Sequence, residues 1–256
     1  MAGMAGLKLI EEYSSSSEDE KESSETVEKK IKLNSLPLPK FTPVRVGLQD
    51  REVVLDNPGD HHGRIRSFGH ERGNWATLVY AEYEPSEVLV SWMKSVNVTI
   101  PSGILIFNDC HLSFSRTLVL KYHWIESFIE SLRDLTRSTL KFTLQITNVN
   151  VYCNEERTRT FIALECQPLD QTLSQYMISL NKLLSEYQLP PFYKEASYHI
   201  SFLWLLGDKE DDLRKLIPGL NESLSDILSK NFENSYITVE NIHCKVGNKL
   251  YKWVLR

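Results

Sequence analysis

The sequence lacks the features that would place the chain in a membrane or outside the cell. Its 256 residues contain no apolar run that approaches the ~18 residues needed to span a bilayer. The first residues, MAGMAGLKLIEEY, turn acidic at once and lack the basic start, long apolar core and cleavage site of a secretory signal. We therefore expect an intracellular protein without a membrane partner.

Cysteine and metal-binding patterns are scarce as well. The four cysteines are widely spaced and form no C-x-x-C pair: Cys110, Cys153, Cys166 and Cys244. In a reducing compartment this spacing predicts four free, mostly buried thiols. His61, His62 and His70 form a loose cluster without nearby cysteines or clustered carboxylates, so zinc-finger spacing is absent. We expect neither a metal nor any other cofactor.

An excess of positive charge is also missing, which at first argues against a nucleic-acid partner. The net charge is −5, from 29 basic and 34 acidic residues. Residues 11–28 alone contribute −7, from eight acidic residues and one lysine, and this leaves about +2 for the rest of the chain. The presumed folded part is therefore mildly basic, which permits an RNA substrate without demanding one.

Composition divides the chain near residue 60. The serine- and acid-rich run cannot bury apolar area, and KLNSLPLPKFTP follows it with three prolines. We therefore predict a disordered tail over residues 1–60, either simply solvated or carrying serines that are phosphorylated beside acidic residues. The folded domain is predicted over residues 61–256.

Hydrophobic periodicity predicts a mixture of strands and helices over the folded part. The expected strands are 75–83, 104–115, 140–152, 158–166, 198–206, 235–244 and 249–255. The expected helices are 85–96, 118–138, 169–187 and 208–230, the last kinked at Pro218–Gly219. Both halves of this series contain strands, helices and one His-x-Ser strand. This indicates an α+β fold with two pseudo-symmetric lobes of antiparallel sheet plus helices around a central cleft.

Two short strings carry the chemistry: CHLSFS at 110–115 and YHISFL at 198–203. Because side chains alternate between the faces of a strand, His111 and Ser113 share one face, and His199 and Ser201 share another. The apolar residues between them point the opposite way. About one match to His-x-Ser or His-x-Thr is expected by chance, but two matches in apolar strand context, far apart in the chain, indicate a paired function.

Two such strands that face one cleft suit cleavage of RNA by internal transesterification. A neutral imidazole removes the proton of a 2′-hydroxyl, which attacks the adjacent phosphorus, while a protonated imidazole donates to the departing 5′-oxygen. The serine hydroxyls donate to the non-bridging phosphate oxygens. This chemistry needs no metal because the nucleophile belongs to the substrate.

At these strings the chain resembles the two-histidine phosphoesterase superfamily, and more closely the U6 snRNA phosphodiesterases. The stretches that carry the closer resemblance are GRIRSFGHERGNWATLVY at 63–80, FNDCHLSFSRTLVLKYHWI at 107–125, EERTRTFIALE at 155–165, PFYKEASYHISFLW at 191–204 and VENIHCKVGNKLY at 239–251. The resemblance spans residues 63–256 and does not cover the tail.

The resemblance implies a two-histidine phosphoesterase fold and a 3′-to-5′ exoribonuclease. Such an enzyme trims the 3′ oligouridine tail of U6 snRNA in the nucleus. It leaves a 2′,3′-cyclic phosphate or an opened 3′ phosphate. The implied partner is an RNA 3′ end, and we expect the protein to act as a monomer.

By the same resemblance, His111 and His199 are the catalytic pair, and Ser113 and Ser201 bind phosphate. Which histidine is the base and which the acid stays open.

Further positions complete the implied substrate-binding set: Tyr193, Ser197, Leu112, Ile200 and Glu155. Tyr193 stands where the family stacks an aromatic ring on a nucleobase, although it could also simply pack beside Pro191. Ser197 would help to hold the terminal nucleotide. Glu155 stands where the family has a glutamine that contacts uracil. A glutamate lacks the amide donor, which puts that contact and the strength of uridine preference in doubt.

Other residues near the motifs have structural explanations. Trp75 and Trp204 are expected to pack in the core, and His123 and His243 to be structural. A set of cations either meets RNA phosphates or forms surface salt bridges and solvated faces: Arg72, Arg157, Arg159, Lys245, Lys249 and Lys252.

Two alternative functions fit the same residues. The chain could be a cyclic phosphodiesterase that only opens 2′,3′-cyclic ends, or a non-catalytic RNA-binding module that kept the cleft. The presence of both histidines and both serines of the two motifs argues against the second alternative.

Overall fold

The structure is a computed structural model that describes residues 71–107, 109–193 and 197–256. The tail predicted over residues 1–60 and the predicted start of the domain at residue 61 lie outside the described residues. The same holds for the loose cluster of His61, His62 and His70.

One antiparallel sheet of ten strands forms the framework of the described residues. Its order is β10 (Lys249–Val254), β9 (Asn241–Val246), β1 (Asn74–Glu82), β3 (His111–Ser113), β7 (Tyr198–Leu206), β6 (Arg159–Pro168), β5 (Phe142–Cys153) and β8 (Tyr236–Val239). Two short strands lie off this path: β2 (Ile104–Leu105) pairs with β7, and β4 (Leu118–Lys121) pairs with β1.

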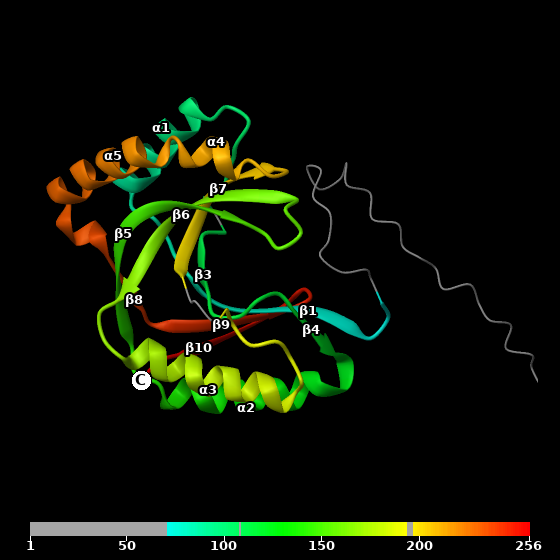
Figure 1. Ribbon diagram of the computed structural model, residues 1–256. Helices are drawn as coiled ribbons and strands as arrows, with labels where there is room; N and C mark the ends of the chain where they lie inside the picture. Colours follow the sequence, from blue (N-terminus) through cyan, green and yellow to red (C-terminus); the bar gives the residue numbers. More distant parts are fainter. Residues whose placement is uncertain (1–70, 108, 194–196) are drawn as a thin grey trace, which may run out of the picture. The chain divides into compact units, whose positions relative to one another are not determined.

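The sheet curls round so that its two ends approach each other. Strands β8 and β9 are far apart in the sheet order, yet only Glu240 separates them in the chain. The backbone of the last two residues closes this junction: the N–H of Leu255 donates to the carbonyl of Glu240 at 2.8 Å, and that of Arg256 to the carbonyl of Thr139 at 2.9 Å. Figure 1 shows the resulting curved sheet, with the C-terminus beside β8 and β10.

Helices cover the outer side of each half of this sheet and define two lobes, as predicted. Helices α2 (Ile125–Ser138) and α3 (Thr172–Glu186) pack on each other, and α2 contacts β9 and β10. Helices α1 (Glu87–Thr99), α4 (Glu210–Arg214) and α5 (Ile217–Lys230) lie over β5 and β7 in the other lobe (Figure 1). Short 3-10 turns, η2 (Tyr122–Trp124) and η3 (Phe232–Ser235), complete the chain.

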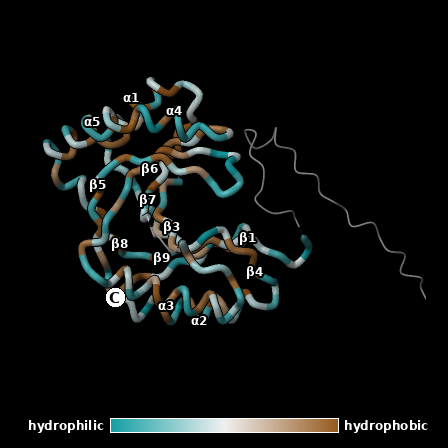
Figure 2. Tube along the Cα trace, in the orientation of Figure 1, coloured by the Kyte–Doolittle hydropathy of each residue, from teal (hydrophilic) through white to brown (hydrophobic). Residues whose placement is uncertain are grey.

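The core lies between the helices and the outer face of the sheet. Leu112, Phe114, Ile200 and Phe202, the apolar residues of the two motif strands, are each 0–1% exposed. The hydropathy changes along the helices as expected for amphipathic elements with one buried side (Figure 2). Burial of the apolar residues therefore fixes which face of β3 and β7 carries the histidines.

Three predicted elements have different boundaries in the structure. Residues 118–121 form strand β4 and not the start of a helix, because Leu118 and Leu120 alternate with less buried neighbours and pair with β1. The predicted strand 104–115 is two short strands, β2 and β3. The predicted strand 235–244 is likewise two strands, β8 and β9, which lie at different places in the sheet.

The predicted kink at Pro218–Gly219 is also displaced. The helical segment 208–230 is broken at 215–216, between α4 and α5, and Pro218 lies in the first turn of α5. Proline has no N–H to donate, and the first turn of a helix is where that donor is not needed. The proline therefore begins a helix here and does not bend one.

Gly247, in the turn between β9 and β10, gives a test of how closely this turn packs against Trp75. Its φ is +57°, and a Cβ added there would lie 2.5 Å from Cε3 of Trp75. We expect Gly247→Ala to lower the free energy of unfolding by about 2–4 kcal/mol, from the left-handed backbone and the steric overlap. Gly219, in α5, has open space around it, so Gly219→Ala should raise this free energy by about 0.5–1 kcal/mol. Urea denaturation measures both; similar effects of the two changes would contradict the packing described.

Candidate active site

The two His-x-Ser motifs lie next to each other, because β3 and β7 are paired. Leu112 is the partner of Ile200 in this antiparallel register. The same register sets His111 opposite Ser201 and Ser113 opposite His199. All four side chains are half-buried, whereas the residues that alternate with them are buried. They therefore form one block of two imidazoles and two hydroxyls on the inner face of the sheet.

The spacing of this block follows from sheet geometry. Residues directly opposite each other across an antiparallel pair have Cβ atoms about 4.5–5.5 Å apart, and diagonal neighbours are roughly 7–8 Å apart. The histidines occupy one diagonal and the serines the other. A phosphate group held over the centre of the block would have an imidazole on either side and hydroxyl donors at the two other corners.

Each histidine is held in the same way by its own strand. Nδ1 of His111 lies 2.7 Å from the carbonyl oxygen of Asp109, and Nδ1 of His199 lies 2.8 Å from that of Ser197. A carbonyl only accepts, so each Nδ1 carries the proton and donates. When the ring is neutral, Nε2 is then the nitrogen that can accept a proton in both histidines.

Aromatic rings fix the planes of both imidazoles. Tyr152 from β5 stacks on His199, with ring centroids 3.8 Å apart and an interplanar angle of 13°. Tyr80 from β1 meets His111 edge to face at 5.4 Å. The hydroxyl of Tyr152 also lies 2.6 Å from Oγ of Ser197, the residue whose carbonyl holds His199. Tyr152 thus supports His199 both directly and through its backbone anchor.

Burial changes the proton affinity of His199. The pKa of His199 is lowered, first by burial and also by the nearby His111, although the hydrogen bond to Ser197 opposes this shift. A lowered pKa means that His199 is neutral at neutral pH and can accept a proton. This observation favours His199 as the base, a choice that the sequence alone left open.

Tyr193 lies at the surface, 44% exposed, and its ring is already in contact with a cation. The guanidinium of Arg116 lies 4.0 Å from the ring centroid of Tyr193. Arg116 also forms an ion pair and hydrogen bond with Glu155. Glu155, which was predicted to contact uracil, is therefore paired with Arg116. Arg116 in turn stacks on Tyr193, the residue predicted to stack on a nucleobase.

The remaining predicted site residues have distinct positions. Ser197 is next to the site through its contacts with Tyr152 and His199. Leu112 and Ile200, at 1% and 0% exposed, point away from the block and into the core. Alternation along the strands puts them on the opposite face, so their side chains support the site from behind and only their backbone is near a substrate.

Two cavities lie beside the block. A cavity of about 1110 Å³ is lined by His111, Tyr80, Glu82 and His243, among others. A smaller cavity of about 560 Å³ is lined by Tyr152, Ser197, Glu165 and their neighbours. The first cavity opens directly at His111, whereas the second is lined by Tyr152 and Ser197, which contact His199, and not by His199 itself.

Sequence reasoning missed Tyr80, Glu82, Tyr152 and Arg116. Tyr80 and Glu82 alternate on β1 and are the register partners of Ser113 and His111. Their period-two spacing was visible, but which strand lies beside β3 depends on long-range pairing. Arg116 directly follows the first motif, and that position was the one local signal for it.

The structure also gives the positions of the other residues near the motifs. Trp204 is 6% exposed, and Trp75 packs against the core. His243 is 2% exposed, whereas His123 lies at the surface. Arg157 forms ion pairs with Asp208 and Glu210. All four cysteines are free, as predicted, and three of them are buried.

Two negative observations concern only the residues that the structure describes. Among residues 71–107, 109–193 and 197–256, no group of three or more His, Cys, Asp or Glu side chains is placed to hold a metal ion. No helix in these ranges is both long and apolar enough to cross a membrane.

Comparison with known proteins identifies the family. A protein family described as HVSL, uncharacterised conserved protein, matches residues 36–253. A protein of Xenopus laevis, U6 snRNA phosphodiesterase 1, is 38% identical over 252 residues, which cover 93% of this chain and 96% of that protein. The chain belongs to the U6 snRNA phosphodiesterase family. The Drosophila melanogaster phosphodiesterase of the same name is also 38% identical, over 215 residues that cover 80% of this chain and 79% of the relative.

Solved structures of two-histidine phosphoesterases are more distant from this phosphodiesterase. Kluyveromyces marxianus Usb1 superimposes with a TM-score of 0.49 at 14% identity, covering 70% of this chain and 97% of that one. Escherichia coli LigT complexed with 3′-AMP superimposes with a TM-score of 0.47 at 12% identity, covering 71% and 98%.

Tyr152 offers a direct test of the environment of His199. We expect Tyr152→Ala to raise the pKa of His199 toward its ordinary value, because the change exposes the ring whose burial lowers that pKa. Tyr152→Phe keeps the stacked ring and should leave the pKa lowered. Titration of the imidazole signals by NMR measures both variants. An unchanged His199 pKa in Tyr152→Ala would show that stacking on Tyr152 is not the source of its burial.

Proposed function

We propose that this phosphodiesterase is a 3′-to-5′ exoribonuclease that trims the 3′ oligouridine tail of U6 snRNA by metal-independent transesterification. The main observation that supports this proposal is the register of β3 and β7, which brings two imidazoles and two hydroxyls into one block. Membership of the U6 snRNA phosphodiesterase family supports the substrate. The product is an RNA with a 2′,3′-cyclic phosphate, or a 3′ phosphate after opening.

His199 is the general base in this mechanism. Its Nδ1 proton is engaged by the carbonyl of Ser197, so Nε2 faces the site. The lowered pKa keeps the ring neutral near pH 7. Nε2 accepts the proton of the 2′-hydroxyl on the penultimate nucleotide, whose oxygen attacks the adjacent phosphorus.

His111 is the general acid. Its Nδ1 is held by the carbonyl of Asp109, and Nε2 donates a proton to the departing 5′-oxygen as the bond from phosphorus to that oxygen breaks. His199 thus gains one proton and His111 loses one, so the two histidines end with their protonation states exchanged. A later hydrolysis of the cyclic phosphate then uses the two histidines with their roles exchanged. Ser113 and Ser201 donate to the non-bridging oxygens, where negative charge builds up.

Tyr193 and Arg116 form the surface for the nucleobase on the His199 side. A base stacks on Tyr193 without reading its sequence. Arg116, oriented by Glu155, supplies the N–H donors that a glutamate cannot, and the carbonyl oxygens of uracil accept such donors. Uridine preference at this position therefore depends on the Arg116–Glu155 pair and not on Glu155 alone.

Trimming of a spliceosomal RNA also implies where and how the protein works. We propose that it acts in the nucleus. We also propose that it acts as a monomer, because both motifs of the site come from one chain.

The first test is cleavage of an RNA with a 3′ oligouridine tail and a free 3′-hydroxyl, in excess EDTA. We expect stepwise shortening by the wild type. His111→Ala and His199→Ala should each lower the rate by about 10²–10⁴-fold, the usual contribution of a positioned acid or base. Products are separated on a gel, and their ends are typed with phosphatase.

His123→Ala, at an exposed histidine outside the site, is the matched control and should keep the wild-type rate. Loss of cleavage in EDTA, or a wild-type rate in either motif variant, would refute the mechanism. Opening of 2′,3′-cyclic ends without shortening would instead identify a cyclic phosphodiesterase, and binding without any turnover would identify an RNA-binding module.

The pH dependence of kcat/KM tests the assignment of the base. A base with a lowered pKa loses its proton at lower pH, so the acidic limb of the profile should fall below pH ~6.5, the value of an ordinary imidazole. In a His111→Ala background the residual rate should keep this limb. An acidic limb at or above the ordinary value would argue against His199 as the base.

A further inference from the structure

The smaller of the two cavities plays no part in the mechanism proposed above. Its volume of about 560 Å³ lies within the ~300–1,000 Å³ typical of small-molecule sites. Tyr152 and Ser197, the two residues that support His199, line it. Arg157 and Arg214 line it as well. The cavity therefore connects the His199 half of the site with a pair of arginines.

A free edge of β5 gives this cavity its open side. β8 pairs with β5 only over residues 142–145, so the rest of β5 has β6 on one side and no strand on the other among the described residues. The N–H of Val149 donates to the side chain of Asn221 on α5. The N–H of Val151 donates to the side chain of Asn150, and both of these residues line the cavity. A polymer that leaves the inner face of the sheet can therefore cross this edge without meeting another strand.

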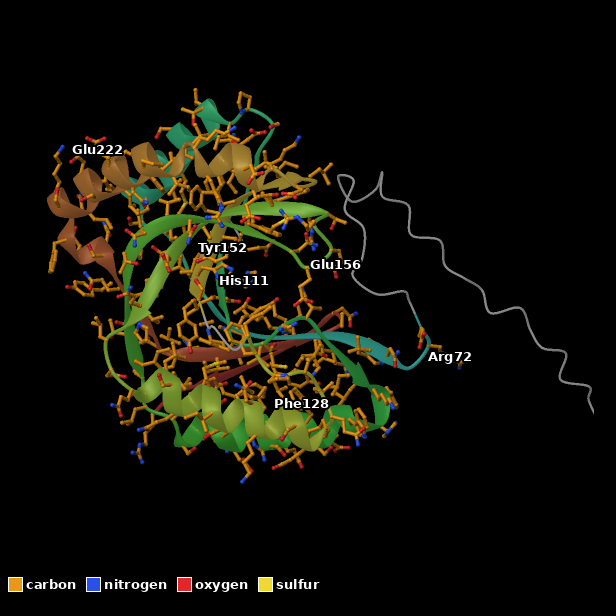
Figure 3. The ribbon with its side chains drawn as sticks, viewed as in Figure 1. Arg72, His111, Phe128, Tyr152, Glu156 and Glu222 are labelled. Carbon is orange, nitrogen blue, oxygen red and sulfur yellow. The ribbon has the colours of Figure 1, made fainter. Side chains whose placement is uncertain are left out.

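The two arginines are fixed by carboxylates and still present an exposed cationic surface. Arg157 lies on the turn between β5 and β6, next to Glu156, which Figure 3 labels there. It donates to Asp208 and Glu210, and Arg214 donates to Glu210. The side chains of Arg157 and Arg214 are 58% and 56% exposed, whereas that of Glu210 is 21% exposed. The outward surface of this cluster is thus cationic, although its formal charges balance.

Both guanidinium groups keep donors for a further acceptor. The printed bonds of Arg157 use Nε and Nη2, and those of Arg214 use the same two nitrogens. Within the part of the chain that the structure describes, Nη1 of each arginine has no hydrogen bond. Guanidinium N–H groups bind phosphate oxygens well, because the charge and the planar array of donors match them. The pair is therefore suited to a phosphodiester.

The direction of the RNA decides which phosphodiester reaches the arginines. In the proposed mechanism the ribose of the penultimate nucleotide contacts His199, and the departing 5′-oxygen faces His111. The strand that is retained after cleavage therefore lies on the His199 side. Its next phosphodiester is attached to the 5′ side of that same ribose, so it leaves the site in the direction of the smaller cavity.

One further carboxylate lines the cavity and separates the two ends of this path. Glu165 is the register partner of His199, so it lies beside the histidine strand. A carboxylate accepts hydrogen bonds from hydroxyl groups and repels a phosphate. The end of the cavity next to His199 thus favours a ribose, and the end with the arginines favours a phosphate.

We propose that the smaller cavity binds the retained RNA strand, and that Arg157 and Arg214 bind the phosphodiester on the 5′ side of the penultimate nucleotide. The inference rests on the proposed ribonuclease function and extends the contact with RNA beyond the two nucleotides at the scissile bond. The contact is independent of sequence, because a phosphate carries no information about the base. An RNA of three or more nucleotides is therefore a better substrate than a dinucleotide.

The test compares two RNA trinucleotides that differ only in this linkage. Both have three uridines, a 3′-hydroxyl and a 2′-O-methyl group on the first nucleotide, so that only the last linkage can be cleaved. The first linkage is a phosphodiester in one RNA and an uncharged methylphosphonate in the other. The wild type should cleave the phosphodiester RNA with a kcat/KM about three- to fivefold higher, the effect of one exposed charge contact.

Arg157→Gln and Arg214→Gln should each reduce this preference, and the double variant should cleave the two RNAs at equal rates. Each ratio compares two RNAs on one enzyme, so a loss of folded protein lowers both values alike and leaves the ratio unchanged. Arg133→Gln is the matched control, because Arg133 is also ion-paired, with Asp134 on α2. Figure 3 shows α2, at the labelled Phe128, in the other lobe. This control should keep the wild-type ratio.

The salt dependence of kcat/KM gives an independent reading. Each phosphate that a protein neutralises on a single strand releases counterions, so the slope of log kcat/KM against log salt should be steeper by roughly 0.7 for the phosphodiester RNA. This difference should disappear in the double variant. Equal cleavage of both RNAs by the wild type, or a wild-type ratio in the double variant, would overturn the inference. Cleavage of neither RNA by the wild type would overturn the proposed function instead.

Discussion

The pairing of β3 with β7 is the constraint on which the site depends. Leu112 opposite Ile200 is its single register partnership, and both side chains are buried in the core. A shift by one residue would turn the histidines and serines toward the core and the apolar residues toward the cleft. The burial of two apolar side chains thus holds two histidines and two serines together on the inner face of the sheet, at the strand pair that joins the two lobes.

Similar motifs acquire different chemistry from their surroundings. Both histidines donate from Nδ1 to a carbonyl two residues earlier. Tyr152, however, stacks closely on His199, and burial lowers the pKa of that histidine, whereas His111 borders a large open cavity. The different surroundings of the two imidazoles are therefore produced by neighbouring strands, since the motifs themselves are nearly identical.

Local patterns in the sequence were enough for the lobes, most helices and strands, and the inward face of the motif strands. The alternation of Leu112 and Phe114 with His111 and Ser113 predicts that face directly. Local patterns could not supply strand neighbours. The positions of Glu82 beside His111 and of Tyr152 over His199 depend on pairing between segments far apart in the chain. For the same reason the division of residues 235–244 into two strands was missed, because β8 and β9 belong to opposite ends of the sheet.

The junction at Glu240 has a consequence for how the chain is made. Strand β1 is synthesised long before β9, yet one of its edges pairs with β9, as in Thr77 with Val246. While the ribosome is still translating, that edge has no partner, and an unpaired strand edge is prone to aggregate. Contacts of such long sequence separation also slow folding. The sheet can therefore close only after β9 has left the ribosome, so nascent chains that stop short of β9 would expose the edge of β1 to chaperones and proteases.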